Sequence, residues 1–231
     1  MLNKKYQSYL IRFFDILFSF FAIIVLFPLM FPIMIILKLT GEHDIFYRQK
    51  RVGRYGKEFN LLKFATMLRD SPNLPGGIFT YKNDPRILPL GKFLRKTKIN
   101  ELPQLINIFI GQMSIIGYRP LVREGYEEYS DEVKQQLYNF NPGLSGIGSI
   151  VFRNEEEIMQ KVKDQEDFYR NMIIPYKGEL EKWYTQNIGL VLYFKIIFFT
   201  AISVLNSSSD FWIRAFDNLP PTPKELEIYL K

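Results

Sequence analysis

The first forty residues carry a long run of apolar positions with no polar face. Asp15 is the only charged residue between Phe13 and Leu37, and from Ile16 onward the run "ILFSFFAIIVLFPLMFPIMIIL" is uncharged. A helix of about 22 residues is roughly 33 Å long, which is enough to cross the hydrocarbon core of a bilayer. The run is too long for the apolar part of a signal peptide, and it is apolar on every face, unlike a core helix of a globular domain. The pattern therefore predicts a membrane anchor.

Two prolines inside the anchor and basic residues on both sides of it bear on its path through the membrane. Pro28 and Pro32 each remove a backbone donor and clash with the preceding turn, so a kink or break is expected. A simple spanning helix has its basic residues mainly on the cytoplasmic side. Here both flanks are basic, which favours a re-entrant helix with both ends in the cytoplasm. A kinked helix that spans the membrane is the alternative. The basic residues are Lys4, Lys5 and Arg12 before the anchor, and Lys38, Arg48, Lys50, Arg51, Arg54 and Lys57 after it.

After the anchor, turn residues and apolar positions predict short strands and then a helix. Gly53 and Gly56 punctuate "FYRQKRVGRYGKEFNLLKFATM", and residues 58–64 are expected to form the second of two strands. Pro103 suits the first turn of a helix covering roughly 103–110. The free N–H groups at such a helix start favour anions, so a phosphate could bind there.

The C-terminal half is expected to be helical. Ser130 is a good N-cap for "SDEVKQQLYNF", and the charged segments at 155–187 are interpreted as helices with solvated charges, broken at Pro175. A second apolar stretch at 188–205 carries Lys195 at its centre, which would cost about 3 kcal/mol in a spanning helix. We therefore favour a core helix or an interfacial helix here over a second span.

These elements predict an α+β fold that is mainly helical and has three parts. Residues 1–40 would form the proline-broken re-entrant membrane helix, and residues 41–205 a cytoplasmic domain with a small sheet and interfacial helices. Residues 206–231 would form a proline-punctuated C-terminal appendage.

Composition limits the chemistry that the 231 residues can perform. There is no cysteine, which excludes disulfides and thiol nucleophiles, and the one histidine, His43, argues against a serine triad or a histidine–zinc site. The formal charge is +6 and the pI is about 9.3. An anionic partner is therefore expected: nucleic acid, a phosphate ester or anionic lipid.

The segment "GKFLRKTKINELPQL" is the candidate site. It places Arg95 and Lys98 beside one carboxylate, Glu101, and one amide, Asn100. Several cations with few acids suit a pyrophosphate, and Glu101 would then be a natural ligand for Mg²⁺. Surface cations that serve solubility or bind anionic lipid would explain the composition equally well. The further candidate residues are Lys63, Arg86, Arg119 and Arg123.

Six blocks in order give the chain a resemblance to a known family. They are an anchor with a central proline, "RQKRVGRYGKEFNLLKFATM", "NDPRI", "GKFLRKTKINELPQL", "GQMSIIGYRP" and "NPGLSGIGS", and they run from about Tyr6 to Leu205. In these blocks the chain resembles the bacterial sugar transferases, the monotopic polyprenyl-phosphate phosphoglycosyl transferases. The extra N-terminal membrane domain of larger relatives is not found, so we expect the minimal catalytic form.

The resemblance implies an activity, a cofactor and a location. Members of the family transfer a sugar-1-phosphate from a UDP-sugar to polyprenyl (undecaprenyl) phosphate and release UMP, which initiates synthesis of O-antigen, capsule or exopolysaccharide. They use Mg²⁺ and a re-entrant helix at the membrane face. We therefore expect a catalytic domain on the cytoplasmic face of the inner membrane, with UDP-sugar, polyprenyl phosphate and membrane lipid as partners. A nucleic-acid partner is not expected, and a homodimer is left open.

The resemblance also implies roles for individual residues. Positions 100 and 101 match the catalytic Asp-Glu pair of the family, in which the Asp is the proposed nucleophile and the Glu helps to hold the metal. Glu101 would thus take the metal role. The residues expected to bind substrate are Lys63, Arg86, Arg95, Lys98 and Arg119, of which Lys63, Arg95 and Arg119 match family motifs.

Asn100 is the departure from the family pattern that matters most. An amide oxygen is a poor nucleophile toward phosphorus, because it is neutral and its electrons are delocalised. Gln112 and Tyr118 also replace the usual Asp and Pro of their blocks. Three accounts stay open: Asn100 positions substrate while the lipid phosphate attacks directly, Glu101 is itself the nucleophile, or the chain is impaired.

Two other functions compete with this enzyme. A non-catalytic member of the family, acting as a membrane-bound binding or assembly partner, would explain Asn100. A membrane-tethered nucleic-acid binder is suggested only by charge, since the chain lacks a basic helix or an aromatic RNA platform. Release of UMP from UDP-sugars separates the enzyme from the non-catalytic member, and salt-sensitive retention of oligonucleotides would support the third function.

Overall fold

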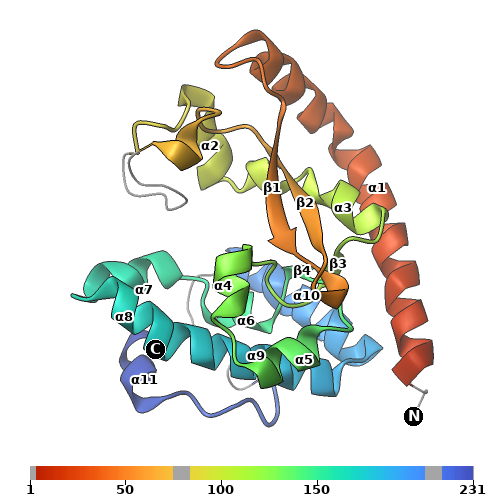
Figure 1. Ribbon diagram of the computed structural model, residues 1–231. Helices are drawn as coiled ribbons and strands as arrows, with labels where there is room; N and C mark the ends of the chain where they lie inside the picture. Colours follow the sequence, from red (N-terminus) through yellow and green to blue (C-terminus); the bar gives the residue numbers. More distant parts are fainter. Residues whose placement is uncertain (1–3, 75–83, 206–214, 231) are drawn as a thin grey trace. The chain divides into compact units, whose positions relative to one another are not determined.

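The computed structural model describes residues 4–74, 84–205 and 215–230, and its internal contacts divide the chain into two units (Figure 1). The anchor unit comprises Ile16–Lys50 and Asn60–Ile110. The large unit comprises Met1–Asp15, Arg51–Phe59 and Gly111–Lys231. Each unit has its own apolar core. The three-part division expected from the sequence is not tested by these units and stays a prediction.

The fold is mainly helical, as the sequence predicted, and the described residues form two small sheets where one was expected. Strands β1 (Phe46–Val52) and β2 (Glu58–Phe64) form one sheet, and β3 (Ser114–Ile116) and β4 (Gly143–Ser145) form the other (Figure 1). Single turns of 3-10 helix, η1 to η3, cover Arg54–Gly56, Ser71–Asn73 and Ile99–Glu101, and η4, a π turn, covers Tyr169–Ile173. The α-helices are α1 (Lys4–Leu39), α2 (Pro89–Lys96), α3 (Gln104–Phe109), α4 (Arg123–Glu127), α5 (Asp131–Leu137), α6 (Ile147–Val151), α7 (Glu155–Lys161), α8 (Gln165–Phe168), α9 (Ile174–Asn187), α10 (Leu190–Leu205) and α11 (Lys224–Leu230).

Helix α1 contains the apolar anchor and continues past both Pro28 and Pro32. In its most apolar stretch of 18 residues, only 17% is buried. Side chains such as Phe21 and Val25 are 54% and 72% exposed. An exposed apolar surface of this extent is typical of a membrane contact. Among the residues that the structure describes, α1 is the one helix long and apolar enough to cross a membrane, which indicates a membrane-anchored protein. The re-entrant path is not tested and stays a prediction.

Asp15, the one charged residue of the anchor, is buried in the large unit. Its Oδ1 accepts hydrogen bonds from Ser114 Oγ (3.0 Å), from the backbone N–H of Ile115 (2.9 Å) and from the hydroxyl of Tyr193 (2.9 Å). A carboxylate removed from water needs donors of this kind. Asp15 therefore fixes the first part of α1 to β3 and α10.

The anchor unit is built on the buried face of α1. Met30, Ile33 and Leu37 recur at intervals of three and four residues, so they share one side of the helix. They pack against Phe64 of β2 and Leu94 of α2. The same α1 surface that holds the unit together thus supports the strand and helix that carry the candidate site.

Asn107 of α3 joins this helix to β2. Its Nδ2 donates to the carbonyl of Asn60 (2.8 Å), and its Oδ1 accepts the backbone N–H of Leu62 (3.0 Å). Asn107 is 1% exposed, so both polar ends of the buried amide are satisfied. These two bonds hold α3 against β2.

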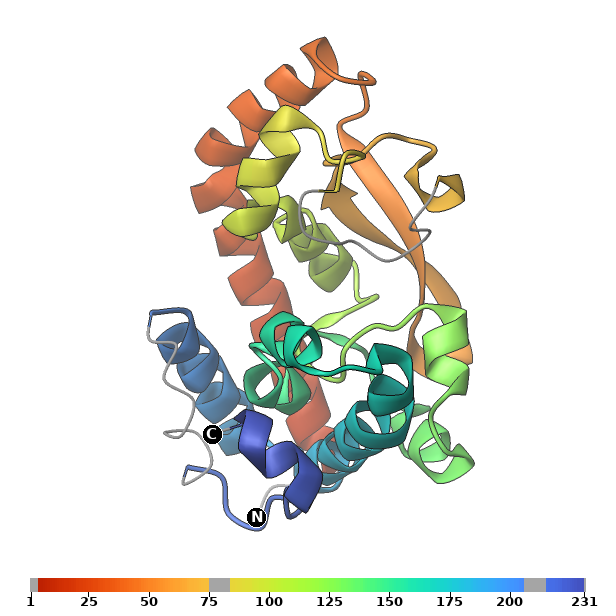
Figure 2. The ribbon, with the colours of Figure 1, turned by 90° about the vertical axis from the view of Figure 1, so that its left-hand side faces the viewer.

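In the large unit, α9 is the central helix, and α5 and α6 pack against it (Figures 1 and 2). Tyr176, Leu180 and Tyr184 are its buried apolar side chains in the main core. Strands β3 and β4 pair in parallel, with Ser114 opposite Gly143.

The second apolar stretch forms α10, a core helix with one exposed apolar side. Tyr193 is fully buried, whereas Val191 and Phe198 are 84% and 59% exposed. The ammonium of Lys195 lies 5.2 Å from the centre of the Phe216 ring, a cation–π contact that reduces the cost of placing a charge in this helix. The expected core helix is confirmed, and an interfacial role for the exposed side stays a prediction.

The end of the chain packs on the large unit as well. Leu226 and Leu230 of α11 are buried in its main core, and the hydroxyl of Tyr176 donates to the carbonyl of Pro220 (3.1 Å). Residues 206–214 of the expected appendage lie outside the described residues.

Several local predictions are confirmed. Strand β2 covers Glu58–Phe64, and α3 covers Gln104–Phe109, close to the expected 103–110. The side chain of Ser130 caps α5 by accepting a hydrogen bond from the N–H of Val133 (3.4 Å).

The prediction that the charges at 155–187 are solvated is wrong for two residues of α9. Lys177 is 8% exposed and Glu181 is 2% exposed. They lie one helical turn apart on the side that also carries Leu180 and Tyr184, which packs into the core. Pro175, at which a break was expected, lies in the first turn of α9.

Candidate functional site

Four of the predicted site residues come from one continuous segment of the anchor unit. Arg95 lies in the last turn of α2, and the chain then turns at Lys98 into η3, which contains Asn100 and Glu101. Lys98 makes the turn in the left-handed region (φ 59°, ψ 9°), at a cost of about 1–2 kcal/mol for a residue with a side chain. Backbone strain of this kind is commonly retained at functional sites.

The carboxylate of Glu101 faces the ammonium of Lys63 from β2. Nζ and Oε1 are 3.8 Å apart, and the two side chains are 21% and 30% exposed. Arg95 is partly buried, with Nη1 3.5 Å from Sδ of Met67, and Lys98 is exposed. Three cations and one carboxylate give this set a net charge of +2. The excess suits a phosphate ester.

Asn100 is buried beside this set, at 6% exposed. Its Oδ1 has no hydrogen-bond partner among the described residues. An unsatisfied buried acceptor costs about 1–3 kcal/mol, so proteins rarely keep one without a use. This oxygen could accept a hydrogen bond from a ligand or coordinate a cation.

Arg86 has structural contacts instead of an exposed guanidinium. It is 3% exposed, with Nη2 2.6 Å from Oδ2 of Asp84 and Nη1 donating to the carbonyl of Ser71 (2.8 Å). These contacts join Arg86 to Asp84 and to Ser71 of η2. A role for Arg86 in binding substrate stays a prediction.

Arg119 belongs to the large unit and is exposed, three residues after the end of β3. The backbone before it is fixed by β4: Gly117 donates its N–H to the carbonyl of Ser145 (2.9 Å), and Gly143 donates to the carbonyl of Tyr118 (2.8 Å). A Cβ atom on Gly143 would collide with the backbone of Gly117. The glycines of "NPGLSGIGS", which the sequence explains only as a turn signal, thus allow β4 to approach the "GYRP" block.

Arg123, the other candidate cation of the large unit, is tied to its neighbours. Its Nη2 donates to the carbonyl of Gly56 (2.9 Å), and its guanidinium forms ion pairs with Glu58 (3.4 Å) and Glu127 (3.5 Å). These contacts hold η1 against α4.

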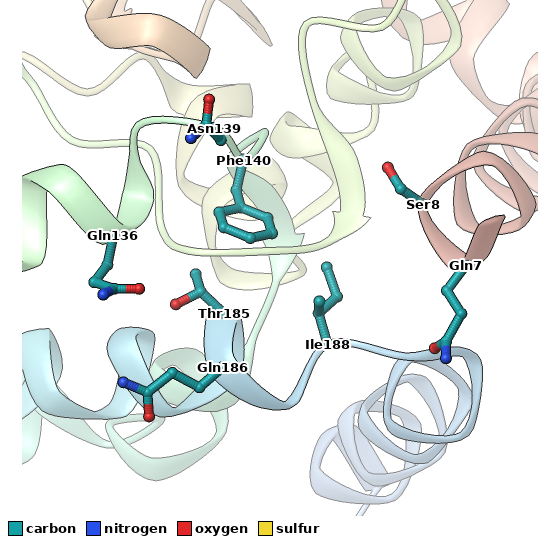
Figure 3. Close-up of a pocket in the computed structure, with 8 residues that line it drawn as sticks. All are labelled: Gln7, Ser8, Gln136, Asn139, Phe140, Thr185, Gln186 and Ile188. Carbon is teal, nitrogen blue, oxygen red and sulfur yellow. The ribbon is translucent and has the colours of Figure 1, made fainter. Parts of the chain in front are cut away.

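The large unit also has a pocket of about 400 Å³ (Figure 3). None of its lining side chains is charged, and a diphosphate needs cations or a metal. The pocket therefore does not match the phosphates of a nucleotide-sugar. Its lining residues are Gln7, Ser8, Gln136, Asn139, Phe140, Thr185, Gln186 and Ile188.

Sequence reasoning missed two buried charges of α9, Lys177 and Glu181. Glu181 is 2% exposed, and its burial raises its pKa to about 8. Lys177 forms an ion pair with Glu155 (2.7 Å), and its ammonium lies 5.1 Å from the centre of the Phe152 ring. Burial lowers the pKa of Lys177.

A signal for these charges was present in the sequence. Lys177 and Glu181 are four residues apart and in step with the apolar residues Ile173, Leu180 and Tyr184. Residues at such intervals share one helix face. The helical period therefore placed both charges on the apolar side of the helix.

Comparison with known proteins identifies the family. The profile of the bacterial sugar transferase family matches residues 6–207. An undecaprenyl-phosphate galactose phosphotransferase of Salmonella typhimurium is 33% identical over 218 residues, which cover 88% of this chain and 42% of that protein. A UDP-N-acetylgalactosamine-undecaprenyl-phosphate N-acetylgalactosaminephosphotransferase of Aeromonas hydrophila is 30% identical over 208 residues, covering 89% and 46%. The exopolysaccharide production protein PSS of Rhizobium leguminosarum bv. phaseoli is 32% identical over 206 residues, covering 87% and 97%.

The chain spans less than half the length of the Salmonella and Aeromonas proteins and nearly all of the Rhizobium protein. The family profile covers most of α1, the segment with Asn100 and Glu101, and the block with Arg119. The chain therefore belongs to the bacterial sugar transferase family.

Proposed function

We propose that the protein transfers a sugar-1-phosphate from a UDP-sugar to polyprenyl phosphate and releases UMP, as the first step of surface glycan synthesis on the cytoplasmic face of the inner membrane. Similar proteins are named as undecaprenyl-phosphate galactose or N-acetylgalactosamine phosphotransferases, which supports a hexose phosphate as the transferred group. The observation that carries the proposal is that Glu101 faces Lys63, while the buried side-chain oxygen of the adjacent Asn100 has no hydrogen-bond partner among the described residues.

Binding of the UDP-sugar uses the excess of cations. Lys63, Arg95 and Lys98 of the anchor unit attract and orient the diphosphate. A role for Arg119, which belongs to the large unit, in binding substrate stays a prediction. Fixed cations also stabilise charge that develops on phosphate oxygens during transfer.

The reaction is a direct displacement, because an amide at position 100 cannot supply a carboxylate nucleophile. An oxygen of the polyprenyl phosphate attacks the β-phosphorus and forms a new P–O bond. The bond from that phosphorus to the oxygen shared with the α-phosphate breaks, its electron pair goes to that oxygen, and UMP leaves. Asn100 positions the reacting group by accepting a hydrogen bond through Oδ1.

Mg²⁺ is the cofactor that the family implies, and the residues present fit it in part. Glu101 supplies a carboxylate and Asn100 an amide oxygen, both hard oxygen donors. No cluster of three acidic or histidine ligands occurs among the described residues, so water and substrate phosphates would complete the coordination. When bound, the ion would neutralise charge on the diphosphate.

The amide at position 100 also favours a second candidate function. A member of the family without the usual nucleophile could keep its scaffold as a membrane-bound binding or assembly partner. The same experiment separates the two functions.

The test is UMP release from a panel of UDP-sugars with undecaprenyl phosphate and Mg²⁺. We expect release from at least one sugar, a loss of about 100-fold or more in Glu101→Gln, in line with removal of one key charged group, and no loss in the exposed control Glu157→Gln. Chelation of the metal should also abolish release. Equal activity of Glu101→Gln and wild type would remove Glu101 from the mechanism.

Intact-mass measurement after incubation with UDP-sugar and Mg²⁺, without lipid, decides the route. Direct displacement predicts no adduct on the wild-type protein. A mass gain of one sugar phosphate would refute this route and make Glu101, or another carboxylate, the nucleophile. If no UDP-sugar gives UMP with wild type and Asn100→Asp is active, the non-catalytic alternative holds.

A further inference from the structure

Strand β2 has one edge that no other strand covers. Among the described residues its strand partner is β1 alone, so the backbone groups on its other edge need partners of another kind. Asn107 of α3 supplies them: its Nδ2 donates to the carbonyl of Asn60 (2.8 Å), and its Oδ1 accepts the N–H of Leu62 (3.0 Å). Residues two apart in a strand direct their backbone groups to the same side, which is how one side chain reaches both.

The carboxamide of Asn107 takes the place of a peptide group at this edge. An amide side chain carries a donor and an acceptor on the same planar group, as a peptide unit does. Asn107 is 1% exposed, so water hardly competes for the two bonds. Helix α3 is therefore docked on β2 in one position.

This docking closes a ring of contacts around the candidate site, all of it within the anchor unit. On β2, Lys63 follows Leu62 directly. Glu101 lies in η3, and turn bonds continue from η3 into α3, such as the bond from the N–H of Leu105 to the carbonyl of Leu102 (3.0 Å). A shift of α3 along β2 would thus move Glu101 relative to Lys63.

The ion pair of Lys63 and Glu101 is too weak to set this geometry by itself. Nζ and Oε1 are 3.8 Å apart, which is longer than a hydrogen bond, and both side chains are partly exposed. Pairs of this kind contribute little to stability, because they restrict two long side chains and compete with water. The two shorter bonds of the buried Asn107 hold the elements in place instead.

We propose that Asn107 is a positioning residue for the reaction: its carboxamide docks α3 on the open edge of β2 and thereby fixes the distance at which Lys63 faces Glu101. The inference rests on the proposed function, in which Lys63 orients the diphosphate and Glu101 holds the metal. Asn107 acts through these two side chains and not by contact with the substrate.

Two substitutions at position 107 test this role. Asn107→Leu removes both hydrogen bonds with a side chain of the same branching. Asn107→Asp is the conservative variant, because a carboxylate still accepts the N–H of Leu62 but has no proton to donate to Asn60. Ile108→Val is the matched control: Ile108 is the next residue of α3 and fully buried, and its substitution loosens the packing of the same helix without removing a hydrogen bond.

The first measurement is a zero-length cross-link between Lys63 and Glu101, made with a carbodiimide on the full-length protein in detergent and quantified by peptide mass spectrometry. The reagent joins an amine to a carboxylate only where the two groups can meet. We expect the yield to fall about ten-fold in Asn107→Leu, to fall less in Asn107→Asp, and to stay at the wild-type level in Ile108→Val. The reaction is run well below the melting temperature of every variant, so a loss of stability alone does not change the yield.

The second measurement is the kinetics of UMP release, again with every variant folded. We expect kcat to fall about ten-fold in Asn107→Leu, because a small displacement of the reacting groups slows the chemical step. KM for the UDP-sugar should change less than about two-fold, since Arg95 and Lys98 still bind the diphosphate. Asn107→Asp should lie between Asn107→Leu and wild type, and Ile108→Val should match wild type.

The two measurements separate failure of this role from failure of the proposed function. No cross-link in wild type, an unchanged cross-link in Asn107→Leu, or an equal loss in Ile108→Val would overturn the positioning role. A lost cross-link with unchanged kcat would show that the distance does not matter for the reaction, and would overturn the inference as well. Absence of UMP release in wild type would instead overturn the proposed function and the catalytic part of this role, whereas the cross-link would still report whether Asn107 holds the pair together.

Discussion

The burial of Glu181 predicts how the stability of the protein depends on pH. Burial raises its pKa from 4.5 to about 8. The folded state therefore holds a proton that the unfolded state has released across this range. A carboxyl group with a raised pKa destabilises the folded state progressively as pH rises from 4.5 to 8, and its effect is constant above that range.

The size of the effect follows from the shift. Each unit of pKa difference is worth about 1.4 kcal/mol, so the full penalty above pH 8 approaches about 5 kcal/mol as an upper bound. Between pH 6 and pH 8 the penalty grows by about 2 kcal/mol, because the unfolded carboxyl is ionised throughout and the folded one is only beginning to ionise. Glu181→Gln keeps the shape of the side chain and, because an amide does not ionise, has no such pH-dependent penalty. For a chain of this length the melting temperature of Glu181→Gln should gain about 4–8 °C on wild type over the same interval.

Thermal unfolding of both proteins in one detergent, at pH 6, 7 and 8, is the assay. Comparing two proteins that differ at one residue cancels most of the titration of other groups, including Lys177, whose pKa burial lowers. The pKa values of Tyr118, Tyr129 and Tyr184 are raised by burial, so these hydroxyls stay neutral over the interval. Parallel melting curves, with a constant gap between wild type and Glu181→Gln at all three pH values, would refute the reasoning.

Two further predictions concern α1. Asp15→Ala leaves the donors of Ser114, Ile115 and Tyr193 without their acceptor and should lower the free energy of unfolding by about 3 kcal/mol. Asp15→Asn keeps an acceptor oxygen, so its free energy of unfolding should fall by about half as much or less. Equal stability of the two variants in denaturant titrations would show that these bonds do not anchor the helix. The second prediction uses single cysteines introduced at Ser8 and Tyr55, which are both exposed in a chain without natural cysteines. If α1 is re-entrant, both cysteines should react alike with an impermeant thiol reagent in intact spheroplasts. Labelling of one without the other would favour the spanning helix.

The elements that the sequence predicted well are those with a local cause. Ser130 caps α5 because its hydroxyl reaches a free N–H in the first turn, and strand β2 follows the turn made by Gly53 and Gly56. The length and uniform apolarity of α1 likewise need no tertiary information. Each of these predictions depends on residues within a few positions of one another.

The predictions that failed or were missed depend on partners far along the chain. Glu181 is buried because Gly148 leaves space for its carboxyl group, and that space cannot be inferred from α9 alone. Gly143 serves the approach of β4 to Gly117, although the sequence around it indicates only a turn. Arg86 has the same charge as Arg95 in the sequence, yet its buried guanidinium is held by the carbonyl of Ser71, 15 residues earlier, as well as by the neighbouring Asp84. Charge and spacing indicate which residues can bind phosphate, and packing decides which of them remain exposed to do so.

At Asn100, the sequence motif and the packing in the structure have to be considered together. The motif alone indicates a lost nucleophile, and an impaired protein would be the simplest conclusion. The structure adds that the amide is buried, that its oxygen lacks a partner within the described residues, and that Glu101 beside it faces Lys63. Replacing a carboxylate by an amide also leaves one negative charge fewer near the cations, which strengthens their attraction for a diphosphate. A site that had lost all function would have no reason to keep an unsatisfied oxygen buried at a cost, next to a backbone strained at Lys98. These features favour a site that binds both phosphate substrates at once and lets the lipid phosphate attack without a covalent intermediate.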